Sequence, residues 1–356
     1  MALPIKTSYA PMDALSVDTI PDGPDWQYEP KWDGFRCLAF RDGNKIDVQS
    51  KSGQPLGRYF PELLDALREL PPSKFVLDAE IVIPQGQSLS FDALLQRIHP
   101  SESRIRKLSA ETPGVLVVFD LLVDADGKDL SGQTLDVRRH ELERFAAKHF
   151  RANERVILSP AATDLKTAHK WFAGVGGALD GVIAKRTDMP YQSGNRTGMV
   201  KIKKLRTADC VVGGFRYASK GKSIGSLLLG LYGDDGLLHH VGFCSSFKTD
   251  ERKKLSAMLE PLIQPPGFTG RSPGGPSRWS TERSTEWKPL APKIVVEVRY
   301  DHFTGGRFRH GTAFLRWRPD KAPKQCTMAQ VEQESASNPL KFLTGAAAGP
   351  SRRKSA

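Results

Sequence analysis

The sequence has few cysteines, no long apolar run and fewer acidic than basic residues. Only four of its 356 residues are cysteines, and they lie far apart without a Cys-x-x-Cys or Cys/His ligand pattern. This spacing excludes a disulfide framework and a structural zinc site, and we expect reduced, packed thiols. No run of about 18 apolar residues occurs, which excludes a membrane-spanning helix. Residues 1–10 contain one lysine and no apolar signal segment, so we expect a cytoplasmic protein with no membrane partner.

The shortage of acidic residues leaves a large positive charge. The chain has 52 Lys and Arg against 40 Asp and Glu, a formal net charge of +12. Two stretches are especially basic: residues 201–222 hold seven Lys and Arg against one Asp, and residues 299–324 hold seven against two. Clustered basic side chains gain affinity for a phosphate backbone by releasing its counterions. Either stretch alone could be a solvated face, but two stretches on either side of one expected domain favour a nucleic acid or nucleotide partner.

Length and residue pattern predict two domains. The first 200 residues alternate short apolar strands with amphipathic helices, which is typical of an α+β fold. We expect strands over 75–83, 115–123, 179–184 and 199–203. We expect helices that begin at Pro61 and after Ser90, and a longer helix over 135–150.

After residue 204 the pattern changes to short, glycine-containing strands. We expect strands over 210–217, 225–232, 237–243 and 294–300, with a helix over 249–263, and these predict a small antiparallel barrel. Residues 264–292 hold six Pro and four Gly, and their pattern predicts no defined element. The expected domains are therefore 1–204 and 205–333, followed by a mobile basic tail over 334–356.

A candidate nucleophile lies in the segment Glu29-Pro-Lys31-Trp-Asp33-Gly34-Phe-Arg36. A lysine in an apolar turn beside other cations can act as an amine nucleophile. Taken alone, a Lys-x-Asp-Gly motif also fits an ordinary surface turn. The ordered set of motifs behind it is what favours chemistry at Lys31.

Three further segments carry charged or aromatic candidates. Asp78 and Glu80 share one face of an expected strand and suit a divalent metal, or else a structural ion pair. Phe119 could stack on a base, although a phenylalanine in a buried strand is more often part of the core. Lys201 and Lys203 lie on one strand face as a phosphate clamp, or as the lysines of a solvated edge strand.

The segment 180–185 combines a carboxylate, a glycine and a lysine. Asp180 offers an oxygen ligand, and Gly181 permits a close approach of backbone or ligand. Strict strand alternation predicts that Asp180 and Lys185 lie on opposite faces.

In order and spacing these segments resemble the nucleotidyl motifs of the covalent nucleotidyltransferase superfamily, which comprises DNA ligases, RNA ligases and mRNA capping enzymes. The motifs fall at Lys31, 50–53, 78–80, Phe119, 180–185 and 201–203. The closer likeness is to bacterial ATP-dependent DNA ligases of the ligase C type. It rests on stretches such as 58–63, 96–100, 206–211 and 308–326, and it covers most of residues 10–333.

This resemblance implies a fold and a set of roles. The first domain would be an adenylation (nucleotidyltransferase) domain of mostly antiparallel sheets with flanking helices, and the second a small OB-fold β-barrel. Lys31 would be the adenylated lysine, and Glu80 and Asp180 would hold a metal, Mg²⁺ or Mn²⁺. The residues expected to bind ATP or its phosphates are Glu29, Arg36, Lys51, Phe119, Lys185, Lys201, Lys203, Arg318, Asp320 and Lys321.

Two positions differ from the common pattern of the superfamily. Lys51 stands where an arginine is usual, which keeps the charge but loses a bidentate fork. Asp180 stands where a glutamate is common, and its shorter side chain changes the reach toward a metal. In the second domain, residues 318–321 resemble an Arg-x-Asp-Lys element that orients pyrophosphate when that domain closes over ATP.

The implied activity is ATP-dependent sealing of nicked duplex DNA in repair, by a nucleoid-associated monomer. The resemblance suggests bacterial Ku or a repair polymerase or primase as partners. An RNA ligase or a capping-type nucleotidyltransferase uses the same lysine chemistry, so both remain alternatives. A non-catalytic module that grips single strands through aromatic side chains is an alternative of a different class.

Overall fold

The computed structural model describes residues 2–86, 88–174, 179–218, 223–274 and 286–331. These residues divide into two compact units, one within residues 1–204 and one within residues 205–334. None of the described helices is long and apolar enough to cross a membrane. The expected tail over 334–356 lies outside the described residues.

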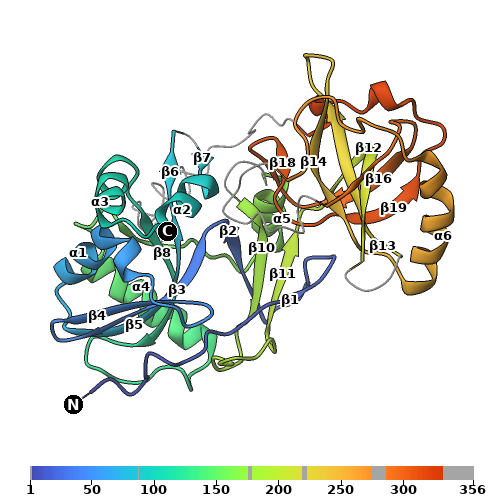
Figure 1. The fold of residues 1–356 in the computed structure, drawn as a ribbon. Coiled ribbons are helices and arrows are strands. Elements are labelled where there is room, and N and C mark those ends of the chain that lie inside the picture. The colour runs from blue at the N-terminus through green and yellow to red at the C-terminus, as the bar shows by residue number, and fades with distance from the viewer. Residues whose placement is uncertain (1, 87, 175–178, 219–222, 275–285, 332–356) are drawn as a thin grey trace. The chain divides into compact units, whose positions relative to one another are not determined.

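The first unit contains two main sheets that pack face to face (Figure 1), and a small two-stranded sheet of β6 (Pro84–Gln85) and β7 (Ser88–Leu89). The four-stranded sheet has the order β1 (Leu15–Ser16), β11 (Met199–Lys203), β10 (Leu179–Arg186) and β2 (Trp26–Trp32). The five-stranded sheet has the order β4 (Lys45–Ser50), β3 (Phe35–Asp42), β5 (Lys74–Val82), β8 (Val115–Val123) and β9 (Val156–Leu158). Only the β1–β11 and β8–β9 pairs are parallel, so the expectation of mostly antiparallel sheets is confirmed.

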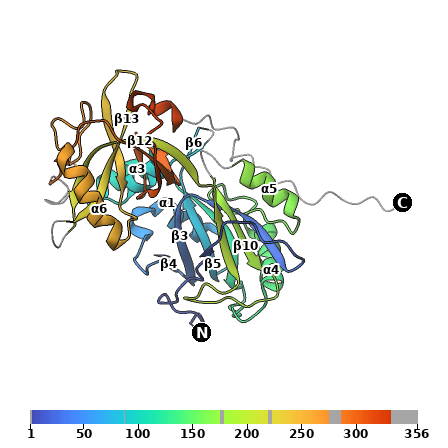
Figure 2. The ribbon, with the colours of Figure 1, turned by 90° about the vertical axis from the view of Figure 1, so that its right-hand side faces the viewer.

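Helices cover the outer faces of both sheets. Helices α1 (Pro61–Glu69) and α4 (Leu135–His149) place Leu63, Leu67 and Leu142 in the core beneath the five-stranded sheet. Helix α5 (Leu165–Ala173) packs its Trp171 on the outer face of the four-stranded sheet, and Figure 2 shows this helix beside β10. The inner faces of the two sheets therefore pack against one another, and polar residues of their strands lie between them.

Local sequence signals account for several of these helices. Pro61 occupies the first turn of α1, where its missing N–H costs nothing. The Ser90 side chain accepts a hydrogen bond from the Ala93 N–H and caps α2 (Phe91–Arg97). Both starts were expected, whereas α3 (Glu102–Glu111) and α5 were not predicted.

The second unit is built on one antiparallel sheet. Its order is β14 (Leu238–Cys244), β13 (Ile224–Tyr232), β12 (Arg206–Tyr217), β16 (Val295–Tyr300) and β19 (Ala313–Trp317), and β15 (Lys288–Pro289) pairs with β12. Helix α6 (Thr249–Leu259) follows β14. The four expected strands and this helix are present, and β19 is additional.

The expected small β-barrel is present as a curled antiparallel sheet, and the described strand ladders do not run continuously around it. The outer strands β14 and β19 approach only through a single bridge between Cys244 and Thr312. The Thr312 N–H donates to the Phe243 carbonyl oxygen at 3.1 Å, and the Phe314 N–H donates to the Ser246 hydroxyl at 3.0 Å. The sheet is therefore curled with a narrow seam rather than closed by a continuous ladder.

Candidate active site

A polar pocket lies between the two sheets of the first unit. Alternation along the four-stranded sheet points Tyr28, Val182 and Ile202 outward into the core under α5. The intervening residues therefore point inward. The pocket is lined by Asp13, Ala14, Glu29, Pro30, Lys31, Trp32, Arg36, Lys51, Glu80, Phe119, Ile183, Lys185, Met199 and Lys201.

Lys31 lies near the end of β2, and its amine forms an ion pair with Asp180 of β10. Lys203 of β11 pairs with the same carboxylate at 3.2 Å. Lys31 is 20% exposed and Asp180 only 5%, so the amine reaches the pocket while its partner is buried. An amine held in this way has a fixed position and an oxygen beside it that can take its proton.

Asp180 reaches this face because β10 is irregular. Leu179 pairs with Trp32 and Gly181 with Lys31, which leaves Asp180 as an extra residue in a bulge. At Gly181, φ is +154° and an added Cβ would come 1.9 Å from the Ile202 carbonyl oxygen, so only glycine fits. The expectation that Asp180 and Lys185 lie on opposite faces is therefore wrong, because the bulge breaks the alternation.

Glu29 and Lys185 form a buried pair at the inner end of the pocket. The Lys185 amine lies 2.8 Å from the Glu29 carboxylate, and both side chains are less than 8% exposed. The Gln27 side chain donates to the other Glu29 oxygen at 2.7 Å. Glu29 is thus fixed from two sides, and Gln27 is a contributor that the sequence gave no reason to single out.

Phe119 borders the pocket between two cations. The Lys185 amine lies 4.6 Å and the Arg36 guanidinium carbon 5.4 Å from the centre of its ring. In the register of β5 and β8, Asp78 pairs with Asp120 and Ala79 with Val118, so Phe119 is the extra residue of a bulge. This irregularity aims the ring into the pocket, although the side chain is otherwise buried like a core residue.

Arg36 of β3 is held by a buried carboxylate. Its guanidinium donates two hydrogen bonds to Asp78, at 3.0 and 2.7 Å, and the Tyr191 hydroxyl donates to Asp78 at 2.6 Å. Although burial acts to lower it, the charge of Asp78 raises the pKa of Arg36 further above its already high value. Arg36 therefore stays charged, with its orientation fixed by Asp78 and Tyr191.

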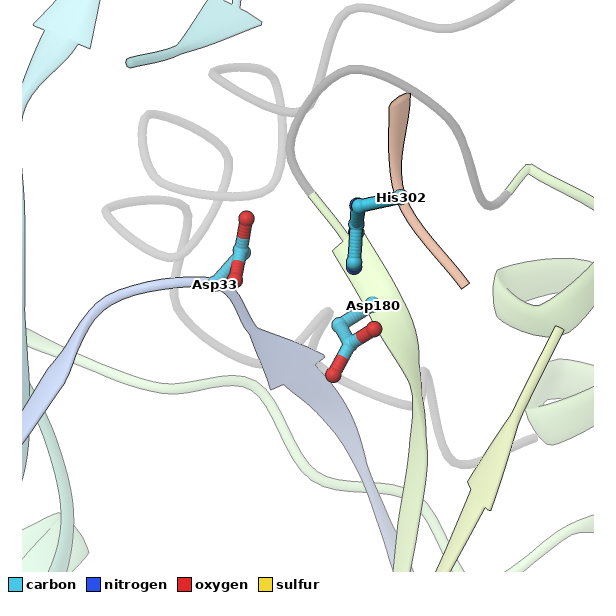
Figure 3. Close-up of side chains that lie close together, drawn as sticks. All are labelled: Asp33, Asp180 and His302. Carbon is cyan, nitrogen blue, oxygen red and sulfur yellow. The ribbon is translucent and has the colours of Figure 1, made fainter. Parts of the chain in front are cut away.

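Three carboxylates could hold a divalent cation. Burial raises the pKa of Glu80 to about 7, reinforced by Asp33 and Asp78 and opposed by Lys31 and Arg36. Asp33 and Asp180 have carboxylate oxygens within 4.8 Å of each other, from the turn after β2 and from β10 (Figure 3). The structure thus brings Asp180 close to Asp33, a residue of the Lys-x-Asp-Gly motif for which the sequence predicted no metal-binding role.

Lys51 and Lys201 complete the positive side of the pocket. Lys51 pairs with Asp13 at 2.8 Å and is 52% exposed. Burial lowers the pKa of Lys201, and Lys31, Lys51 and Lys203 add to this while Asp13 opposes it. Every residue of the first unit that the sequence singled out for the site, except Lys203, therefore lies in the pocket or in an ion pair with a residue that lines it, and Lys203 pairs with Asp180, the partner of Lys31.

The residues expected to act from the second unit form a cluster of their own. Arg318 donates to Asp320 at 2.9 and 2.8 Å and to Asp209 at 2.8 Å. Lys321 also lies 3.3 Å from Asp209. Asp209 belongs to β12 and was not predicted, because a single acid in an apolar strand carries no signal of its own.

Comparison with known proteins agrees with this arrangement. Residues 11–203 match the family model described as ATP dependent DNA ligase domain, and residues 220–321 match ATP dependent DNA ligase C terminal region. The chain is 44% identical to DNA ligase C of Mycobacterium tuberculosis, over 94% of this chain and 96% of that protein. It is 47% identical to DNA ligase C1 of Mycolicibacterium smegmatis, over 93% and 96%.

A solved structure agrees at the level of the fold. A structure from a study of Lig E DNA ligases superposes with a TM-score of 0.54 at 18% identity, covering 86% of this chain and all of that one. The match over both units, together with identities above 40% along nearly the whole length, fixes the family. This chain belongs to the ATP-dependent DNA ligases.

Proposed function

We propose that this enzyme uses ATP to seal nicks with a 5′-phosphate and a 3′-hydroxyl in duplex DNA, through an adenylate on Lys31. The observation that carries the proposal is the placement of Lys31. Its amine enters a pocket that offers Lys51, Lys201 and Arg36 for phosphate groups and the Phe119 ring for a base. Transfer of a nucleotidyl group requires a nucleophile, cations that bind the phosphates and a surface that binds the base, and this pocket supplies all three.

In the first step, the Lys31 amine attacks the α-phosphorus of ATP. A nitrogen–phosphorus bond forms, the bond from that phosphorus to the bridging oxygen breaks, and pyrophosphate leaves. The amine must lose its proton, and the Asp180 carboxylate beside it is the acceptor at hand. Lys201 and Lys51 would offset the negative charge on the phosphate oxygens in the transition state.

A divalent cation fits the acidic side of this pocket. Asp33, Asp180 and Glu80 offer only oxygen donors, which suit Mg²⁺ or Mn²⁺. When bound, such an ion supplies positive charge that withdraws electron density from the phosphate. The Lys31 amine pairs with Asp180, so a bound cation would share this carboxylate with Lys31, and Asp33 and Glu80 would supply further oxygen ligands.

The second and third steps follow from family membership. AMP passes from Lys31 to the 5′-phosphate at the nick, and the 3′-hydroxyl then displaces AMP to join the strands. Arg36 would hold a phosphate through these steps, because Asp78 and Tyr191 fix its orientation. We further propose a monomer associated with the nucleoid that serves DNA repair, with bacterial Ku or a repair polymerase or primase as partners.

The test is the mass of the intact protein after incubation with ATP and a divalent metal. We expect one AMP adduct with ATP, none with GTP or NAD, and none in Lys31→Ala. Lys45→Ala is the matched control, because Lys45 is 76% exposed and pairs only with its neighbour Asp47 among the described residues. It should keep the adduct.

An AMP adduct on Lys31→Ala would overturn the assignment of the nucleophile. Nicked duplexes of DNA and of RNA then identify the acceptor. Preferential sealing of the RNA nick would replace the DNA ligase proposal by an RNA ligase.

A further inference from the structure

Asp13 is a carboxylate on the phosphate-binding side of the pocket, where an acid is unexpected. It lies in the segment just before β1, which pairs with β11 next to Lys201. The Asp13 N–H donates to the Asn195 carbonyl oxygen at 2.8 Å. Its side chain also accepts a hydrogen bond from the Ala14 N–H at 2.9 Å. The carboxylate is therefore fixed in place, with 22% of its side chain exposed.

The partner of Asp13 is the more exposed member of the pair. The Lys51 amine lies 2.8 Å from one Asp13 oxygen, and the Lys51 side chain is 52% exposed. The Arg196 guanidinium lies 3.5 Å from the other oxygen. If Lys51 turned away, Arg196 would still offset the charge of Asp13, so the lysine can leave without stranding a buried carboxylate.

Asp13 is charged at neutral pH. Burial alone would raise its pKa, but the hydrogen bonds from Lys51 and Ala14, with the charges of Lys51 and Lys201, lower it to about 2. A permanent negative charge beside Lys51 and Lys201 repels any phosphate group that approaches these lysines. It also competes with that phosphate for the Lys51 amine.

We propose that Asp13 lowers the affinity of this ligase for phosphate groups. It forms an ion pair with Lys51, and a phosphate must displace Asp13 before it can bind the Lys51 amine. The inference rests on the proposed function, because it takes the ligand of the pocket to be a phosphate of ATP or of the nick. It goes further in assigning a role to an acid outside the nucleotidyl motifs. The consequence is weaker binding, and therefore faster release of pyrophosphate, AMP or sealed DNA, than the lysines alone would give.

The test compares the wild-type protein with Asp13→Asn, which keeps the acceptor for Ala14 and removes only the charge. ATP binding is measured by calorimetry without divalent metal, so that no adenylation occurs. We expect Asp13→Asn to tighten binding by roughly three- to tenfold, which is the scale of a partly exposed ion pair. This increase in ATP affinity should become smaller at high salt concentration, because salt screens the charge of Asp13.

A double-mutant cycle shows whether Lys51 mediates the effect. In a Lys51→Met background we expect Asp13→Asn to change affinity by less than about twofold, because Asp13 then no longer competes with a phosphate for the Lys51 amine. Asp47→Asn is the matched control, since Asp47 pairs with the exposed Lys45 in β4. It should leave ATP affinity unchanged.

A second arm distinguishes the two sources of phosphate. Binding of nicked DNA with a 5′-phosphate is compared with binding of the same duplex with a 5′-hydroxyl. A gain for ATP assigns Asp13 to the nucleotide, and a gain confined to the 5′-phosphate nick assigns it to DNA. Unchanged or weaker binding of both ligands by Asp13→Asn overturns the inference, whereas failure of the wild type to bind ATP counts against the proposed function instead.

Discussion

At the scale of single residues, the pocket is a set of matched charges. The pairs are Lys31 with Asp180, Lys51 with Asp13, Lys185 with Glu29, and Arg36 with Asp78. Such pairing is required because an unpaired charge in a partly buried site is costly. An incoming triphosphate must therefore replace some of these carboxylates as the partner of a cation. The affinity of the site for the triphosphate depends on which of these ion pairs are broken. The pair of Lys51 and Asp13 is the most exposed of the four, so breaking it costs the least free energy.

Glu80 gives the first prediction at this scale. Its pKa is raised to about 7, mainly by burial, so the carboxyl is protonated below that pH and ionised above it. Since only the ionised form binds a divalent cation, self-adenylation at limiting metal should rise as the pH increases through about 7. Excess metal should move this midpoint to lower pH, because metal binding favours the ionised form.

The measurement is the rate of AMP attachment against pH at low and high metal concentration. Glu80→Gln should be slower and should lose the metal-dependent shift of the midpoint. A shift of the same size in Glu80→Gln would show that another group titrates.

At the scale of elements, two β-bulges give the pocket its chemistry. The bulge at Asp180 in β10 brings this carboxylate to the Lys31 side of the sheet. The bulge at Phe119 in β8 turns the ring from a core position toward the pocket. Beyond the first bulge, residues 181–186 pair regularly with β2, which keeps the rest of β10 in register.

The helices beside the five-stranded sheet depend on one buried ion pair. Arg97 of α2 donates to both Glu62 oxygens at 2.7 and 2.8 Å, and also to the Tyr59 and Thr112 carbonyl oxygens. Its side chain is fully buried and Glu62 is 9% exposed. Arg97→Met should lower the free energy of unfolding by about 3–5 kcal/mol, because it leaves Glu62 buried without its cation.

Urea unfolding measures this loss. Arg106→Met is the matched control, because the pair of Arg106 with Glu102 is about three-quarters exposed on both sides. We expect that variant to change stability by less than about 0.5 kcal/mol. Equal effects of the two substitutions would contradict a special role for Arg97.

At the scale of the whole molecule, the chain is two units with separate cores. The nucleotide pocket is built entirely from the first unit, between Asp13 and Lys201. The second unit carries the charged cluster of Arg318, Asp320, Lys321 and Asp209. We propose that this cluster takes part in the step that releases pyrophosphate, so its loss should affect one step of the reaction more than the others.

We expect Lys321→Ala to slow self-adenylation by tenfold or more in relation to sealing of a pre-adenylated nick, in keeping with roughly 2–4 kcal/mol for a lost transition-state contact. The reason is that only the first step involves pyrophosphate. Single-turnover rates of both steps measure the difference. Lys324→Ala is the control, because Lys324 lies only three positions after Lys321 but places its amine over the Tyr232 ring, 4.1 Å from the ring centre. We expect this variant to slow neither step. An equal loss in both steps would argue against a role for Lys321 in pyrophosphate orientation.

The sequence by itself determined the family, several of the strands and the residues that carry the charge. Lys31, Glu80, Lys201 and Lys203 could be predicted because each lies in a short motif whose residue types fit phosphate chemistry. The strands over 115–123 and 199–203 could be predicted because their apolar patterns are local.

Only the tertiary structure decided how these residues meet. Strict alternation gave the wrong face for Asp180, since a bulge depends on the pairing with β2 and not on the strand's own residues. Asp13 carried no signal, because its importance comes from Lys51, which lies 38 residues further along the chain. The degree of closure of the barrel was decided in the same way, because the contact between β14 and β19 is a long-range pairing and no local pattern specifies how far such a ladder extends.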